Sequence, residues 1–81
     1  MKITVLLFAQ ARERAGRANL SLKLPEGSRV SDALATLGRD HPALELLWPH
    51  LAVAVDGQVA APDSALRAGA EVALLPPVSG G

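Results

Sequence analysis

The pattern of apolar and polar positions divides the 81-residue chain into short strands and one clear helix. Residues 3–8 form an unbroken run of large apolar and β-branched side chains, which predicts a central strand with apolar side chains on both faces. Residues 20–24 alternate apolar and polar side chains, as a strand with one buried face does. Asp56-Gly57 is typical of a two-residue hairpin turn. In all, five segments are predicted to be strands: residues 3–8, 20–24, 51–55, 58–60 and 71–75.

A single apolar stripe predicts the main helix, because its side chains recur at i, i+3, i+4 and i+7. These side chains are Val30, Ala33, Leu34 and Leu37. We expect Ser28 to be the N-cap of this helix and Gly38 to end it. Residues 9–15 are rich in helix formers and predict a second, short helix closed by Gly16. Residues 39–50 contain two prolines and are not expected to hold a long element.

This order of elements predicts an α+β domain in residues 1–75, followed by an extended tail in residues 76–81. We expect a mixed five-stranded sheet with the main helix packed across one face. Strand alternation places Leu6, Phe8 and Leu75 on the opposite face, which that helix cannot reach. Alternatively, the short helix that follows Phe8 covers its ring. The strand residues assigned to the core under the main helix are Ile3, Val5, Val72 and Leu74.

Composition narrows the possible functions. The chain lacks cysteine, which excludes disulfides, thiolate metal sites and a thioester on a side chain. It has no apolar run approaching the length of a membrane span and no secretory leader, so we expect a cytoplasmic protein. Few basic residues, one Trp and one Phe disfavour nucleic-acid binding.

The candidate catalytic groups do not form a recognisable active site. His41 and His50 stand beside prolines without clustered acids, so we expect no metal site. The serines lack neighbours that would activate a nucleophile, so we do not expect the chain to be an enzyme by itself. Residues 1–29 hold six basic residues against two acids, and residues 30–81 hold the reverse. This asymmetry is either ordinary solvated charge or a polarised surface that orients a partner.

The final six residues, Pro76 to Gly81, are the strongest candidate for chemistry. Two prolines fix φ and cannot donate to a sheet ladder, so they predict a stiff segment leading away from the last strand. Six extended residues span roughly 20 Å, enough to enter a pocket on another protein. Gly80 and Gly81 lack a Cβ, so nothing shields the terminal carbonyl from a nucleophile. A frayed terminus is the alternative interpretation, since chain ends are commonly disordered.

Over its whole length the chain resembles the MoaD family of sulfur carriers, the small subunits of molybdopterin synthase. The double proline before the terminal glycines distinguishes it from the sibling thiazole carriers, which are usually shorter. Asp56 departs from the family pattern, where Asn often precedes the turn glycine, and Ala70 stands where Asp is common. The motifs that carry the resemblance are Leu7-Phe8-Ala9 with Arg12, Glu13 and Gly16, Pro25-x-Gly27 with Val30 and Leu34, Gly69-x-Glu71-Val72, and the ending Pro76-Pro77-Val78-Ser79-Gly80-Gly81.

The resemblance implies a ubiquitin-like β-grasp fold, in which the first and last strands are neighbours. Leu6, Phe8 and Leu75 would then form one apolar partner interface beside the tail. The resemblance also implies that an adenylating, ATP-using enzyme activates the Gly81 carboxylate and that a sulfurtransferase donor converts it to a thiocarboxylate. The large synthase subunit would receive the tail in a heterotetramer, and sulfur would pass to a pterin precursor of the molybdenum cofactor. The tail residues concerned are Pro76, Pro77, Val78, Ser79, Gly80 and Gly81.

On this interpretation the chain is a non-catalytic subunit that binds no cofactor or metal, because the active site lies on the large subunit. Two other functions stay open. One is sulfur carriage for thiazole synthesis in the thiamine pathway. The other is a β-grasp binding module whose Gly-Gly ending is never activated.

Overall fold

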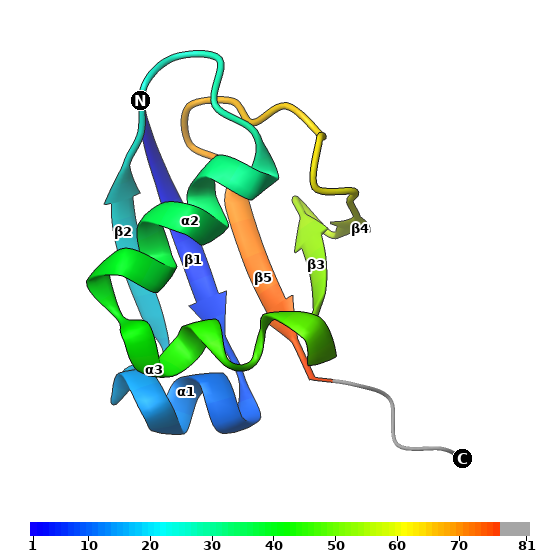
Figure 1. Cartoon of the computed structure of the whole chain (residues 1–81). Helices are drawn as coiled ribbons and strands as arrows, with labels where there is room; N and C mark the ends of the chain where they lie inside the picture. The colour runs from blue at the N-terminus through cyan, green and yellow to red at the C-terminus, as the bar shows by residue number, and fades with distance from the viewer. Residues whose placement is uncertain (77–81) are drawn as a thin grey trace.

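The computed structural model describes residues 1–76, and its elements follow the predicted order (Figure 1). The strands are β1 (Lys2–Leu7), β2 (Asn19–Lys23), β3 (Ala52–Val55), β4 (Gln58–Val59) and β5 (Glu71–Leu75). The helices are α1 (Ala9–Ala15), α2 (Val30–Asp40) and the short α3 (Pro42–Glu45), followed by the 3₁₀ turn η1 (Trp48–His50).

The five strands form one mixed sheet in the order β2-β1-β5-β3-β4. The central strands β1 and β5 are parallel, with Thr4 beside Glu71 and Leu7 beside Leu74, and the other pairs are antiparallel. Because parallel neighbours end at the same edge, the chain leaves β5 at the edge where β1 also ends. Phe8, which follows β1, and Pro76, which follows β5, therefore lie at the same end of the sheet.

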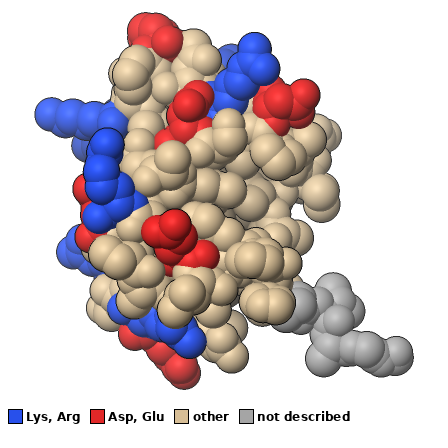
Figure 2. Space-filling model, in the orientation of Figure 1, with Lys and Arg blue, Asp and Glu red and all other residues tan. Residues whose placement is uncertain are grey.

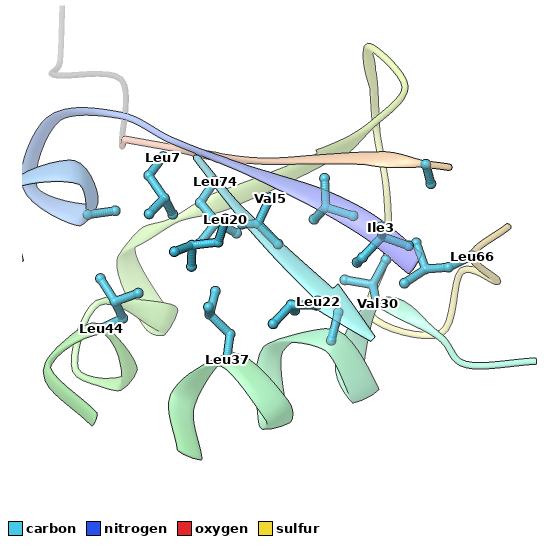
Figure 3. Close-up of a cluster of buried hydrophobic side chains, with 14 of the residues drawn as sticks. Ile3, Val5, Leu7, Leu20, Leu22, Val30, Leu37, Leu44, Leu66 and Leu74 are labelled. Atoms are coloured by element: carbon cyan, nitrogen blue, oxygen red, sulfur yellow. The ribbon is translucent and has the colours of Figure 1, made fainter. Parts of the chain in front are cut away.

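One face of the sheet packs on α2 and forms the core (Figure 3). The four strand residues assigned to this core are at most 1% exposed, which confirms the prediction from strand alternation. Figure 3 shows Leu37 of α2 pointing toward the sheet, below Leu20 and Leu74. Burying a side chain of this size stabilises the fold by about 1.5–3 kcal/mol, so these contacts fix which face α2 covers.

Helix α2 begins one residue later than predicted, with Arg29 rather than Ser28 as N-cap. The Ser28 hydroxyl donates a hydrogen bond of 2.7 Å to the Pro25 carbonyl, so it closes the preceding turn instead of capping the helix. The Asp32 carboxylate accepts a hydrogen bond of 2.8 Å from the Arg29 backbone N–H, which joins the first helical turn to its cap.

Gly38 does not end α2, which continues to Asp40. Gly38 is buried, and a Cβ built on it would lie 3.4 Å from the Trp48 Nε1, an ordinary van der Waals distance, so Gly38 lies inside the helix close beside η1. The helix stops instead at His41, whose φ of −134° and ψ of 76° are not helical. His41 precedes Pro42, and a residue before proline is disfavoured in the helical conformation.

Candidate functional site

The sheet face opposite α2 presents apolar side chains. The register puts Leu6 beside Ala73 and Ala73 beside Ala54, and it pairs Leu75 with Ala52. Figure 3 shows the helices on the other side of the sheet, and among residues 1–76 no helix lies over this face. We call it the open face, and its apolar members are Leu6, Ala52, Ala54, Val59, Ala73 and Leu75.

The structure places two of the three predicted interface residues, Leu6 and Leu75, on the face that strand alternation required, while Phe8 follows the end of β1 at the edge of the sheet. Leu6 and Leu75 are half-buried on the open face, while their chain neighbours Leu7 and Leu74 are buried in the core. Phe8 is 44% exposed, so α1 does not cover its ring; the side chain that α1 buries is Ala11. These positions leave all three predicted residues accessible, and their role in partner binding stays a prediction.

Phe8 also lines a hollow of about 420 Å³ at the end of the sheet where the tail begins. Pro76 is exposed and lines the same hollow, between the start of α1 and η1. The other predicted tail residues, Pro77, Val78, Ser79, Gly80 and Gly81, lie outside the described residues. We call this hollow the tail-root hollow, and its walls are Phe8, Ala9, Gln10, Leu47, His50, Leu51 and Pro76.

Ala9 has a φ of +50°, a left-handed value that is unfavourable for a residue with a Cβ. It is the first residue of α1 and directly follows Phe8, whose backbone is extended. The backbone N–H groups of Ala11 and Arg12 both donate to the Phe8 carbonyl, so α1 starts without a linker. This abrupt change of direction holds Phe8 at the edge of the sheet.

Two exposed apolar residues were not predicted. Val59 is 81% exposed and pairs with Ala54, which places it on the open face. The position of Val59 could have been predicted from the Asp56-Gly57 turn. A two-residue hairpin pairs Val55 with Gln58 and hence Ala54 with Val59. Leu46 is 73% exposed between α3 and η1, outside the sheet, and no pattern in the sequence marked it.

Asp56, which stands where the family pattern often has Asn, still forms the hairpin turn. Asp56 adopts a φ of +50° and Gly57 a φ of +86°, as a type I′ turn requires. The Asp56 carboxylate accepts a hydrogen bond of 3.0 Å from the Glu71 backbone N–H, and the Asp56 N–H donates to the Glu71 carbonyl. The aspartate thus connects the β3–β4 hairpin to the start of β5.

The histidines are separated in the fold. His41 ends α2, whereas His50 lies in the tail-root hollow. Within residues 1–76, no three His, Cys, Asp or Glu side chains gather as a metal site would require. The helices of this part of the chain also lack the length and apolar character needed to cross a membrane.

A mixed five-stranded sheet with a parallel central pair and one main helix across a single face defines a ubiquitin-like β-grasp protein. A family model described as the ThiS family matches residues 5–81. The chain therefore belongs to the ThiS family, within the MoaD and ThiS group of ubiquitin-like sulfur carriers.

Full-length relatives agree with this assignment. The chain is 39% identical over 83 residues to a molybdopterin synthase sulfur carrier subunit from Chlamydomonas reinhardtii, covering 100% of both chains. It is 41% identical over 83 residues to small archaeal modifier protein 1 from Haloferax volcanii, covering 93% of this chain and 95% of the relative. The crystal structure of SAMP1 from Haloferax volcanii is similar with a TM-score of 0.90 at 38% identity, covering 100% of both chains.

Proposed function

We propose that this chain is the sulfur carrier subunit of a molybdopterin synthase and that Gly81 carries the sulfur as a C-terminal thiocarboxylate. The observation that carries the proposal is the family match through residue 81, which includes the Gly80-Gly81 ending. The full-length identity to a relative with this name supports the same assignment. The expectation from the resemblance supports the same function.

The chemistry follows from the nature of the terminus. A carboxylate is a poor electrophile, and adenylation by an ATP-using enzyme gives it AMP as a leaving group. A sulfurtransferase donor then supplies sulfur at the oxidation level of sulfide, which attacks the Gly81 carbonyl carbon and displaces AMP, and the product is a thiocarboxylate. Glycine leaves this carbon unhindered. The absence of cysteine from the chain leaves no internal thiol to compete for the activated acyl group.

The folded domain would present this terminus to a large subunit. The open face offers Leu6 and Leu75 for docking, with Phe8 at the edge where the tail begins. Exposed apolar surface on a small protein commonly marks an interface. Docking the rigid sheet beside the tail would reduce the entropy lost when the tail is ordered in the partner's active site.

A one-residue extension tests the proposal. Addition of a single residue after Gly81 should abolish molybdopterin synthesis in cells that depend on this chain, because adenylation and sulfur transfer need the Gly81 carboxylate. The extended protein should unfold at the same temperature as the parent, since the extension lies outside the domain. Cofactor synthesis by an extended chain, with the extension shown by mass to persist, would overturn the proposal.

The archaeal relative favours a second candidate function, attachment to other proteins. That relative is named a modifier protein, and the match in sequence and structure extends over nearly the whole chain. The same activated Gly81 carbonyl would then be attacked by an amine instead of a sulfur donor. Proteomic detection of lysine side chains joined to Gly81 would support this function, and co-purification with a pterin-converting subunit alone would support the first.

A further inference from the structure

Four charged side chains form a row across the open face, at the end of the sheet away from the tail. Lys23 and Lys2 are direct cross-strand partners on β2 and β1. Glu71 begins β5, the parallel neighbour of β1, so it lies at the same end of the sheet as Lys2. Asp56 contacts Glu71 through two hydrogen bonds. We call Lys23, Lys2, Glu71 and Asp56 the charge row, and all four are exposed.

The alternation of side chains puts this row on the open face. Ile3 and Val72 are buried in the core, so Lys2 and Glu71, which precede them, point to the opposite side. Lys23 follows the buried Leu22 in the same way. The row is therefore continuous with the apolar surface, which occupies the end of the face nearer the tail.

The order of charges along the row follows the order of strands. Two positive groups lie on β2 and β1, and two negative groups lie on β5 and the β3–β4 turn. The excess of basic residues in residues 1–29 and of acidic residues in the rest of the chain is thus separated in space on this face, because residues 1–29 form β1, α1 and β2. On the helix-covered face, which Figure 2 shows, acidic side chains lie among the basic ones, so the division of charge by strand belongs to the open face.

We infer that the charge row sets the orientation in which a protein partner docks on the open face. The partner would be apolar where it meets Leu6, Ala73 and Leu75, with acidic side chains toward β2 and basic side chains toward the β3–β4 turn. A partner rotated by half a turn in the plane of the sheet would place its charged side chains over the apolar end of the face and leave the charge row unpaired, which costs binding energy and misdirects the tail. This inference rests on the proposed function for the identity of the partner, which is the large synthase subunit.

Charge reversals at the two ends of the row give the test. Lys23→Glu and Glu71→Lys change the net charge in opposite directions. Each nevertheless places a like charge opposite the side chain that the partner is expected to present there. Both should slow association with the large subunit by about fivefold at low ionic strength, and the double variant, which keeps the net charge, should be slower than either. The association rate is measured by stopped flow, and thermal unfolding checks that each variant is folded.

Two variants on the other side of the sheet provide matched controls. Arg39→Glu and Asp40→Lys reverse exposed charges of α2 with the same changes in net charge. They should alter the association rate by less than about twofold, because local complementarity involves the open face alone. Equal effects of Lys23→Glu and Arg39→Glu would overturn the charge row and indicate steering by net charge.

The remaining outcomes are also decisive. A double variant that binds as fast as the parent would overturn the inference, because reversing the row would then have no consequence. Rates for Lys23→Glu and Glu71→Lys that change in opposite directions would overturn it as well. Failure of the parent chain to bind the large subunit at all would overturn the proposed function, and with it this partner for the open face.

Discussion

Phe8 and Pro76 line the same hollow although 67 residues separate them along the chain. The parallel pairing of β1 with β5 brings them together, because both strands end at one edge of the sheet. The tail thus begins next to the most exposed aromatic side chain of the domain, Phe8 at 44%. A partner that receives the tail would meet Phe8 and Leu75 first, and this geometry underlies the predictions below.

Leu75→Glu should weaken binding to the large subunit by more than tenfold, about 1.4 kcal/mol, with little loss of stability. Leu75 lies half-buried on the open face, so the carboxylate stays accessible to water in the free protein. Leu74→Ala is the matched control, because Leu74 is 0% exposed in the core. It should destabilise the fold by about 2–5 kcal/mol and leave the affinity of the folded fraction unchanged.

Binding would be measured by calorimetry and stability by urea unfolding. A Leu75→Glu protein that unfolds, with binding in proportion to its folded fraction, would mean that Leu75 belongs to the core. The assignment of sheet faces would then be inverted.

Ala9→Gly should leave stability unchanged or slightly raised, although glycine normally weakens a helix. The φ of +50° strains an L-residue by about 1–2 kcal/mol, and glycine removes that strain in return for greater freedom of the unfolded chain. Ala11→Gly is the control in the same helix, where a buried methyl group is lost from a helical position, and it should cost about 2 kcal/mol. Equal destabilisation of the two variants in urea unfolding would argue against a strained Ala9.

Much of the fold could be predicted because it depends on side-chain periodicity. The i, i+3, i+4, i+7 stripe from Val30 to Leu37 specified α2, and alternation in residues 3–8 and 71–75 separated the core from the open face. The helix stripe records burial directly, whereas the two-residue period of a strand divides the side chains between the two faces of the sheet. The sequence alone therefore suffices to assign Leu6 and Leu75 to the face opposite α2.

Other features depend on tertiary contacts that no local pattern records. Gly38 has the sequence signature of a helix end, yet it lies inside α2, buried beside Trp48. Ser28 has the chemistry of an N-cap, but its hydroxyl bonds to the Pro25 carbonyl. The left-handed backbone of Ala9 had no signal, because alanine does not mark such a conformation as glycine would.

Gly80→Ala should slow both activation and sulfur transfer while leaving thermal stability unchanged. The added methyl group restricts φ and widens the chain next to the reacting carbonyl, so the terminus is less easily placed for attack. Single-turnover transfer from the thiocarboxylate form to the large subunit would measure this effect. Equal rates for the variant and the parent would mean that the partner's channel does not require a glycine at this position.

The central claim is that Gly81 carries sulfur, and the intact mass of the chain purified from its own cells tests it most directly. We predict a fraction in which sulfur replaces one terminal oxygen, assigned to Gly81 by fragmentation and lost when the activating enzyme is deleted. A chain that carries only a carboxylate, in cells that are actively making molybdopterin and under conditions that preserve thiocarboxylates, would contradict the account.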